Sequence, residues 1–148
     1  MMGPSRSTWL TWALAAVLAL PACRGTREVE VASAADLAAA DTAVVRCLPG
    51  IAIDRVDGDP TYRVVSTATR PVTLRLPPGV HVLAVRLDRR SATDEVLFQR
   101  FYRDDSEAIE VDLRARAGAA YVLDFAVDGR RWRPRLRYAD GSDDPNGS

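Results

Sequence analysis

Alternation of apolar and polar residues is the feature that most restricts how this chain can fold. Apolar residues occupy every second position in four runs: Val72–Leu76, Val80–Leu87, Ile109–Leu113 and Tyr121–Val127. A period of two gives each run one apolar face, which predicts half-buried β-strands rather than helices. The dipeptide Asp128-Gly129 ends the last run. It predicts a tight hairpin into a further strand, Arg130–Tyr138.

Turn residues separate these runs at short intervals. They form four clusters: Leu48-Pro49-Gly50, Asp57-Gly58-Asp59-Pro60, Pro77-Pro78-Gly79 and Ala117-Gly118. Glycine supplies positive φ angles and proline fixes its own φ, so these clusters reverse the chain. Seven or eight short strands with such breaks predict an all-β domain, a small antiparallel β-sandwich over residues 43–139. The spacing in Asp94–Tyr102 fits a helix as well as a strand, and we assign it as a strand.

The N-terminal segment has the pattern of a secretory signal over residues 1–22. An uncharged apolar run, Trp9–Leu20, follows Arg6 and is shorter than the roughly 20 residues of a membrane-spanning helix. It closes with Leu20-Pro21-Ala22-Cys23, which resembles the lipobox of bacterial lipoproteins. The resemblance implies cleavage before Cys23 and acylation of its thiol and of the new amine. The alternative is an ordinary signal peptide followed by a chance cysteine.

The same resemblance implies a place in the cell. A lipid-anchored protein of the bacterial envelope is expected, and Arg24 is not the aspartate associated with inner-membrane retention. We therefore expect the outer membrane, with the protein facing the periplasm. Residues 23–42 are expected to form the lipidated N-terminus and a flexible tether with a helical turn near Ala34–Ala40. Residues 140–148 are expected to form a disordered acidic tail.

Two motifs in the middle of the chain resemble PEGA-type β-domains. They are Val56-Asp57-Gly58 and Leu76-Pro77-Pro78-Gly79-Val80-His81. Small bacterial lipoproteins carry a similar arrangement, with an opening like Cys47–Gly50 and an end like Gly118–Tyr121 and Trp132–Pro134. The resemblance implies a sandwich of the immunoglobulin, prealbumin or PEGA kind, without catalytic activity and attached to membrane- or wall-associated machinery. The chain departs from the PEGA pattern at Thr61–Arg70, where that module has a tight turn.

Composition argues against several functions. The 20 basic residues, all arginine, balance 20 acidic residues, whereas nucleic-acid binding needs a basic excess. One histidine and two cysteines are too few for a multi-ligand zinc site. Two groups of aspartates lack the spacing of a calcium loop: Asp54, Asp57 and Asp59, from which we expect turn formation, and Asp140, Asp143 and Asp144, from which we expect solubility. Asp104 and Asp105 are paired carboxylates, but successive strand residues point to opposite faces, so solvated loop residues are favoured over a general acid/base pair. We expect no metal, no other cofactor and no nucleic-acid partner.

No catalytic residues are expected. His81 begins an apolar strand face, and Gly-x-Ser-x-Gly does not occur in the sequence. A hydrogen-bonded structural role for His81 is therefore favoured over a role as a base. Cys47, the one thiol left after signal removal, lies in an apolar run. It is expected either to be buried or to bridge to another chain, burial being favoured.

Arg130–Tyr138 is the most suggestive surface segment. On a strand, four arginines share one face: Arg131, Arg133, Arg135 and Arg137. Pro134 lacks an N–H and indicates an edge strand. The arginines could simply protect that edge from strand addition, or could dock an anion. We expect a non-enzymatic accessory or scaffolding protein that contacts another protein or an envelope polymer. The alternative is a binding module for a polyanionic glycan or lipid through the Arg131–Arg137 strip.

Overall fold

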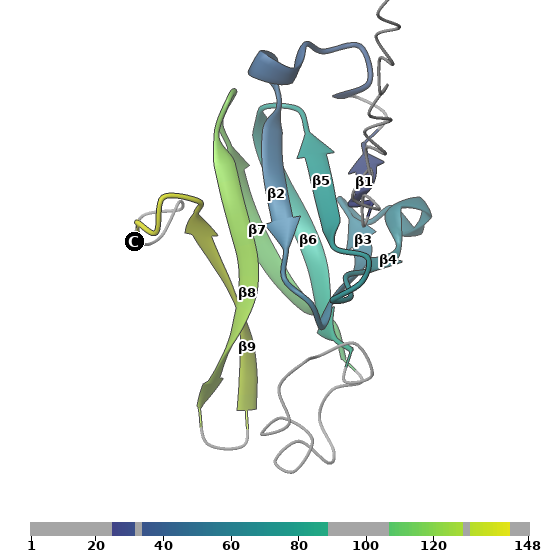
Figure 1. The fold of residues 1–148 in the computed structure, drawn as a ribbon, viewed down its shortest axis with the longest axis vertical. Helices are drawn as coiled ribbons and strands as arrows, with labels where there is room; N and C mark the ends of the chain where they lie inside the picture. The colour runs from purple at the N-terminus through teal and green to yellow at the C-terminus, as the bar shows by residue number, and fades with distance from the viewer. Residues whose placement is uncertain (1–24, 32–33, 89–106, 129–130, 143–148) are drawn as a thin grey trace, which may run out of the picture.

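The protein is a two-layered β-sandwich. A computed structural model describes residues 25–31, 34–88, 107–128 and 131–142 (Figure 1). These residues form nine strands in two sheets, with two short 3₁₀ turns, η2 (Ala39–Asp41) and η3 (Pro60–Tyr62), and no α-helix among them. The all-β prediction is confirmed. The expected strand Asp94–Tyr102 lies outside the described residues.

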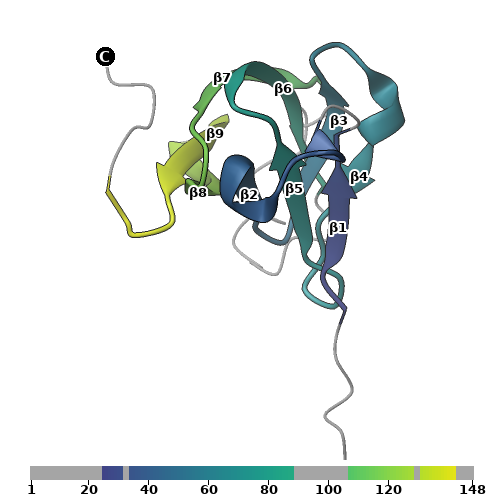
Figure 2. The same ribbon diagram turned by 90° about the horizontal axis from the view of Figure 1, so that it is seen from above.

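One sheet has five strands and the other four. The larger has the order β1 (Arg27–Glu30), β5 (Val72–Leu76), β2 (Ala43–Cys47), β8 (Ala120–Asp128) and β9 (Arg131–Tyr138). The smaller has the order β4 (Val64–Val65), β3 (Ile51–Val56), β6 (Gly79–Leu87) and β7 (Ile109–Ala115). Seen from above, the sheets lie as two layers (Figure 2). The described part of the chain thus has more strands than the seven or eight predicted.

The larger sheet is mixed, so the prediction of a purely antiparallel sandwich is wrong for this layer. β1 runs parallel to β5, and β2 runs parallel to β8, while every pair in the smaller sheet is antiparallel. The chain passes between the two layers four times on its way from β2 to β8. Alternation marks which face of a strand is buried but carries no information on strand direction.

The predicted tether contains part of the sandwich. Arg27–Glu30 pairs with Val72–Arg75, and the Val31 N–H donates to the Arg75 carbonyl at 3.1 Å. Ala34 is fully buried. The expectation of a flexible tether is therefore wrong for the described residues between 27 and 42, because Val29 and Val31 extend the core beyond β5. The sandwich begins at Arg27, sixteen residues before the predicted boundary at residue 43.

The predicted tail likewise begins with an ordered turn. Oδ1 of Asp140 accepts from the N–H of Ser142 at 2.9 Å and from its hydroxyl at 2.7 Å. These hydrogen bonds lower the pKa of Asp140, and the one from the Ser142 side chain has the largest effect. Residues 143–148 lie outside the described part.

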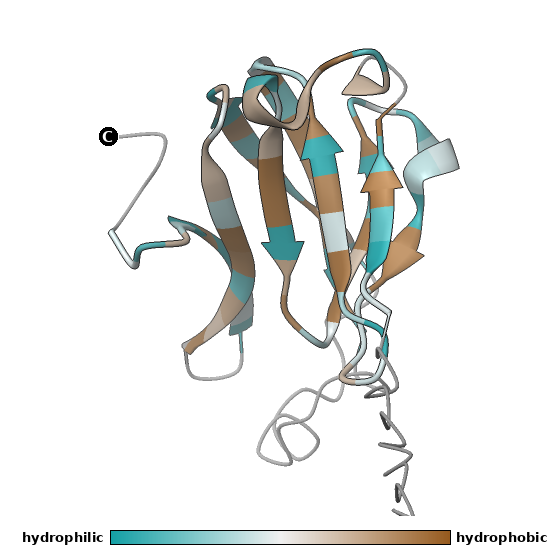
Figure 3. Ribbon diagram, turned by 45° about the horizontal axis from the view of Figure 1, so that its top comes forward, coloured by the Kyte–Doolittle hydropathy of each residue, from teal (hydrophilic) through white to brown (hydrophobic). Residues whose placement is uncertain are grey.

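One apolar core fills the space between the layers. It draws Val45, Leu74 and Leu123 from the larger sheet, all fully buried. Ile53, Leu83 and Leu113 come from the smaller sheet and are also fully buried. Hydrophobic and hydrophilic residues alternate along the strands, as the ribbon colours show (Figure 3). Burial of each such side chain stabilises the fold by about 1.5–3 kcal/mol.

Tyr121 fixes the crossing from β7 to β8. Its ring is buried, and its hydroxyl donates to the Arg114 carbonyl at 3.2 Å and accepts from the Arg116 N–H at 3.1 Å. The ring stacks on Tyr138 with centroids 5.2 Å apart. The Tyr121 side chain thus satisfies a carbonyl at the end of β7 and an N–H in the connection that follows β7. Tyr121 itself belongs to β8 in the larger sheet, so these hydrogen bonds join the two layers.

We expect Tyr121→Phe to lower the free energy of unfolding by about 1–3 kcal/mol, because it removes one hydroxyl and leaves two backbone groups without their partner. Urea denaturation measures this loss. Tyr138→Phe is the matched control, with an expected change below about 0.5 kcal/mol, since the described structure gives its hydroxyl no hydrogen bond. Equal effects of the two substitutions would contradict the bridging role of Tyr121.

Candidate binding surfaces

The predicted arginine strip lies on the outer face of the larger sheet, along its edge strand. Among the strands that the structure describes, β9 pairs only with β8, so the edge position indicated by Pro134 is confirmed. The Tyr138 N–H points away from β8 and donates to the Ser142 carbonyl at 3.3 Å. Because direction alternates along a strand, the nitrogen of Pro134 also faces the free edge. The proline therefore costs the β8–β9 ladder no hydrogen bond.

Asp124 binds two of the four arginines of the strip, Arg135 and Arg137. It lies on β8 directly opposite Arg135 and is only 4% exposed, although it belongs to the outer face. Its Oδ1 accepts from Nε of Arg135 at 2.9 Å, and its Oδ2 accepts from Nη2 of Arg135 at 2.9 Å. Nη2 of Arg137 donates to the same Oδ2 at 2.6 Å. Two of the four arginines therefore neutralise a carboxylate that they also cover.

Arg131 and Arg133 differ from that pair. Both are exposed, and neither forms an ion pair or side-chain hydrogen bond within the described residues. β2 pairs with β8 only from Ala120 to Leu123, so the half of the hairpin that carries these two arginines extends beyond β2 (Figure 1). Arg46 on β2 adds an exposed guanidinium to the same outer face.

Both ring nitrogens of His81 have hydrogen-bond partners, in agreement with the hydrogen-bonded role favoured from the sequence. Its ring is buried, with Nδ1 2.7 Å from Oδ2 of Asp57 and Nε2 2.8 Å from the Pro77 carbonyl. Asp57 in turn accepts from the Val82 N–H at 2.7 Å and adopts a left-handed φ of 52°. The histidine thus joins two predicted turns to β6.

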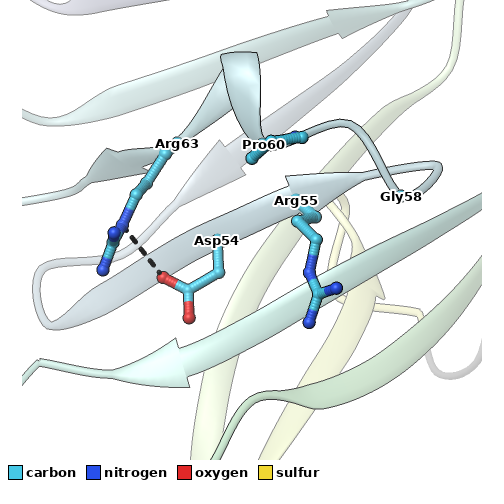
Figure 4. Close-up of a pocket in the computed structure, with 5 residues that line it drawn as sticks. All are labelled: Asp54, Arg55, Gly58, Pro60 and Arg63. Carbon is cyan, nitrogen blue, oxygen red and sulfur yellow. Dashed lines mark ion pairs between the residues drawn. The ribbon is translucent and has the colours of Figure 1, made fainter.

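A shallow hollow lies on the outer face of the smaller sheet. It has a volume of about 380 Å³ and is lined by five residues: Asp54, Arg55, Gly58, Pro60 and Arg63 (Figure 4). Asp54 accepts from Nε of Arg86 at 3.2 Å, and Nε of Arg63 lies 3.5 Å away. From the sequence, Asp54 was weighed only as a calcium ligand and as a turn residue. Its partners Arg63 and Arg86 are 9 and 32 residues away along the chain, so no local sequence pattern links them to Asp54.

The three aspartates that were weighed for calcium have separate partners. Asp54 faces Arg86, and Asp57 faces His81. Asp59 accepts from the Thr61 N–H at 2.8 Å at the start of η3. Hydrogen bonds from Thr61 lower the pKa of Asp59, with the Thr61 side chain having the largest effect and its backbone N–H the next. Within the described ranges, no group of three or more His, Cys, Asp or Glu residues is placed to hold a metal ion.

Cys47 is buried, which was the favoured interpretation of this thiol. It is 1% exposed, and burial raises the pKa of the thiol from 9.0 to about 12. Cys23, the predicted lipidation site, lies outside the described residues, as do Asp104 and Asp105. No helix in the described segments is both long and apolar enough to span a membrane.

Comparison of the whole chain with models of protein families, with curated proteins and with solved structures finds no match. The surfaces described above are therefore the features of this chain from which its function is inferred.

Arg137→Ser and Arg133→Ser test the division of the strip, because they make the same change two residues apart on one strand face. We expect Arg137→Ser to lower the free energy of unfolding by about 1–2 kcal/mol, since it removes a charged hydrogen bond from a nearly buried carboxylate. Arg133→Ser should change it by less than about 0.5 kcal/mol. Urea denaturation at low and high salt measures both. A larger loss from Arg133→Ser would contradict the assignment.

Cys47 should make the stability depend on alkaline pH. The folded state favours the neutral thiol, while the unfolded thiol ionises near pH 9.0, so its contribution is complete below that value and is lost as pH rises toward 12. Against Cys47→Ala, the wild type should lose about 1.4 kcal/mol per pH unit over this window. Denaturant unfolding at several pH values measures the difference, and parallel profiles would contradict it.

Proposed function

We propose that this chain is a non-enzymatic, lipid-anchored protein of the bacterial cell envelope that acts as an accessory or scaffolding domain. Its contact surface is the projecting half of the β8–β9 hairpin, and its partner is a protein or polymer of the envelope with an acidic surface. The lipobox resemblance at Leu20–Cys23 supports acylation of Cys23 and a place on the outer membrane facing the periplasm.

One observation carries the proposal: the two arginines on the projecting half of the hairpin form no ion pair or side-chain hydrogen bond within the described structure, although Asp128 lies opposite Arg131 in the ladder. Arg131 and Arg133 lie two residues apart on one strand face, which separates them by about 7 Å. Guanidinium groups bind carboxylate and phosphate through paired hydrogen bonds. Arg135 and Arg137, by contrast, are held by Asp124.

A catalytic role has little support among the reactive side chains. Both ring nitrogens of His81 face acceptors, so neither is placed to take a proton from a nucleophile. The thiol of Cys47 is buried and has a pKa of about 12, so it is a poor nucleophile. We therefore propose binding rather than catalysis.

A finer fold relationship is also part of the proposal. The positive φ angles at Asp57, Gly58 and Gly79 agree with the Asp-Gly and Pro-Gly turns of PEGA-type domains. The hydroxyl of Tyr121 binds the backbone five and seven residues upstream, as the tyrosine corner does in immunoglobulin-like sandwiches. We propose kinship with these sandwiches, with a mixed sheet as the difference.

The second candidate function is recognition of a polyanionic glycan or lipid by the same surface. It is favoured by the two neighbouring exposed charges of Arg131 and Arg133, which lie on one strand face. Binding of either partner falls with ionic strength, so the chemical identity of the crosslinked partner, a protein or a polyanionic glycan or lipid, distinguishes the candidates.

Crosslinking in membranes tests the proposal. We expect the full-length wild type and the matched variant Arg27→Ser/Arg70→Ser, which removes two exposed arginines elsewhere, to capture the same partner. Arg131→Ser/Arg133→Ser should capture at least tenfold less, because the anion loses its paired donors. Capture that is equal for all three forms would place the contact elsewhere.

The anchor is tested in the same cells. A clickable palmitate analogue should label the wild type and fail to label Cys23→Ser, which should also leave the membrane fraction. Labelling of Cys23→Ser, or absence of label from the wild type, would overturn the proposed anchoring. Neither result would affect the conclusion drawn from crosslinking of the hairpin variants.

A further inference from the structure

A β-bulge shapes the hollow on the smaller sheet, on the opposite side of the sandwich from the arginine strip. The register between β3 and β6 shifts between Ile53 and Arg55. Ile53 and Val56 are both buried in the core, so two successive side chains, Asp54 and Arg55, lie toward the outer face. Bulges redirect side chains in this way and are frequent beside binding sites.

The charges around the hollow are unequally engaged. Arg86 holds both carboxylate oxygens of Asp54, at 3.2 and 3.4 Å, and is itself largely covered. Arg63 lies farther from Asp54, at 3.5 Å, and its side chain is 67% exposed. Arg55 has no ion pair or side-chain hydrogen bond within the described residues. Arg63 can therefore turn toward a ligand while Arg86 keeps Asp54 in place.

The turn after β3 forms the wall of the hollow. Asp59 caps η3 by accepting from the Thr61 N–H, and the Val56 and Asp59 backbones pair with each other at 2.9 and 3.1 Å. Gly58 and Pro60 present backbone and a proline ring beside Arg55 (Figure 4). A volume of about 380 Å³ falls at the lower end of the range for small-molecule sites, and it fits a ligand the size of a monosaccharide.

We propose that this hollow binds a compact hydroxy acid, such as a sugar acid. The guanidinium of Arg55 or of Arg63, which lie on either side of Asp54 (Figure 4), binds its carboxylate, the carboxylate of Asp54 accepts from its hydroxyl groups, and the proline ring packs against its carbon skeleton. The acceptor is what selects this class of ligand. Asp54 repels a bare inorganic anion, whereas a molecule that carries both a carboxylate and hydroxyl donors satisfies both kinds of group.

Calorimetric titration of the full-length chain in detergent, with glucuronate, glucose and inorganic phosphate at constant ionic strength, tests the proposal. We expect saturable binding of glucuronate, with glucose and phosphate each at least tenfold weaker. Arg55→Ser/Arg63→Ser should weaken glucuronate binding at least tenfold, and Arg27→Ser/Arg70→Ser should leave it unchanged. Asp54→Asn should weaken glucuronate and strengthen phosphate, because the repulsion is removed. Thermal unfolding establishes that each variant is folded.

Three results would overturn the proposal. Binding of glucose as tight as that of glucuronate would remove the role of the arginines. Binding of phosphate as tight as that of glucuronate would remove the role of Asp54. A loss in Arg27→Ser/Arg70→Ser equal to that in Arg55→Ser/Arg63→Ser would show that net charge alone is responsible. None of these results bears on partner capture by the β8–β9 hairpin, so the proposals for the two sites are tested independently.

Discussion

The structure depends on the burial of one face of each sheet against the other. Every long strand contributes apolar side chains at alternate positions, and the two layers exclude water only when they cover each other. This requirement turns the polar side chains outward and leaves each layer with a charged outer face. The chain crosses repeatedly between the layers, and Tyr121 stabilises one of these crossings through its two backbone hydrogen bonds.

The outer faces use arginine in two different ways. Asp124 is nearly buried on an outer face because Arg135 and Arg137 close over it, and Arg86 similarly holds Asp54 on the opposite side. In each case a carboxylate occupies some of the neighbouring guanidinium groups and leaves others without a partner. A chain of zero net charge therefore carries local positive surface. We place the proposed binding surfaces at the arginines that these carboxylates leave unpaired, together with Arg63, whose ion pair with Asp54 is the longer one at 3.5 Å.

Much of the fold could be predicted because its signals are local. The bounds of β5 agree with the predicted run Val72–Leu76, and the hairpin before Arg131 and the burial of Cys47 agree as well. β1 was missed because Arg27–Glu30 contains only one apolar residue, and it becomes a strand only through pairing with β5. The bulge in β3 was missed because it arises from the register with β6, which no single segment encodes.

The sequence by itself determined the all-β class, the positions of most turns, the edge strand at Pro134 and the arginine-rich face. These follow from the period of side-chain direction and from backbone restrictions at glycine and proline, which act within a few residues. Only the tertiary structure decided strand direction, the engagement of Arg135 and Arg137 by Asp124, and the hollow beside Arg55. Those features depend on which distant segments become neighbours, and ion pairing acts over distances in space rather than along the chain.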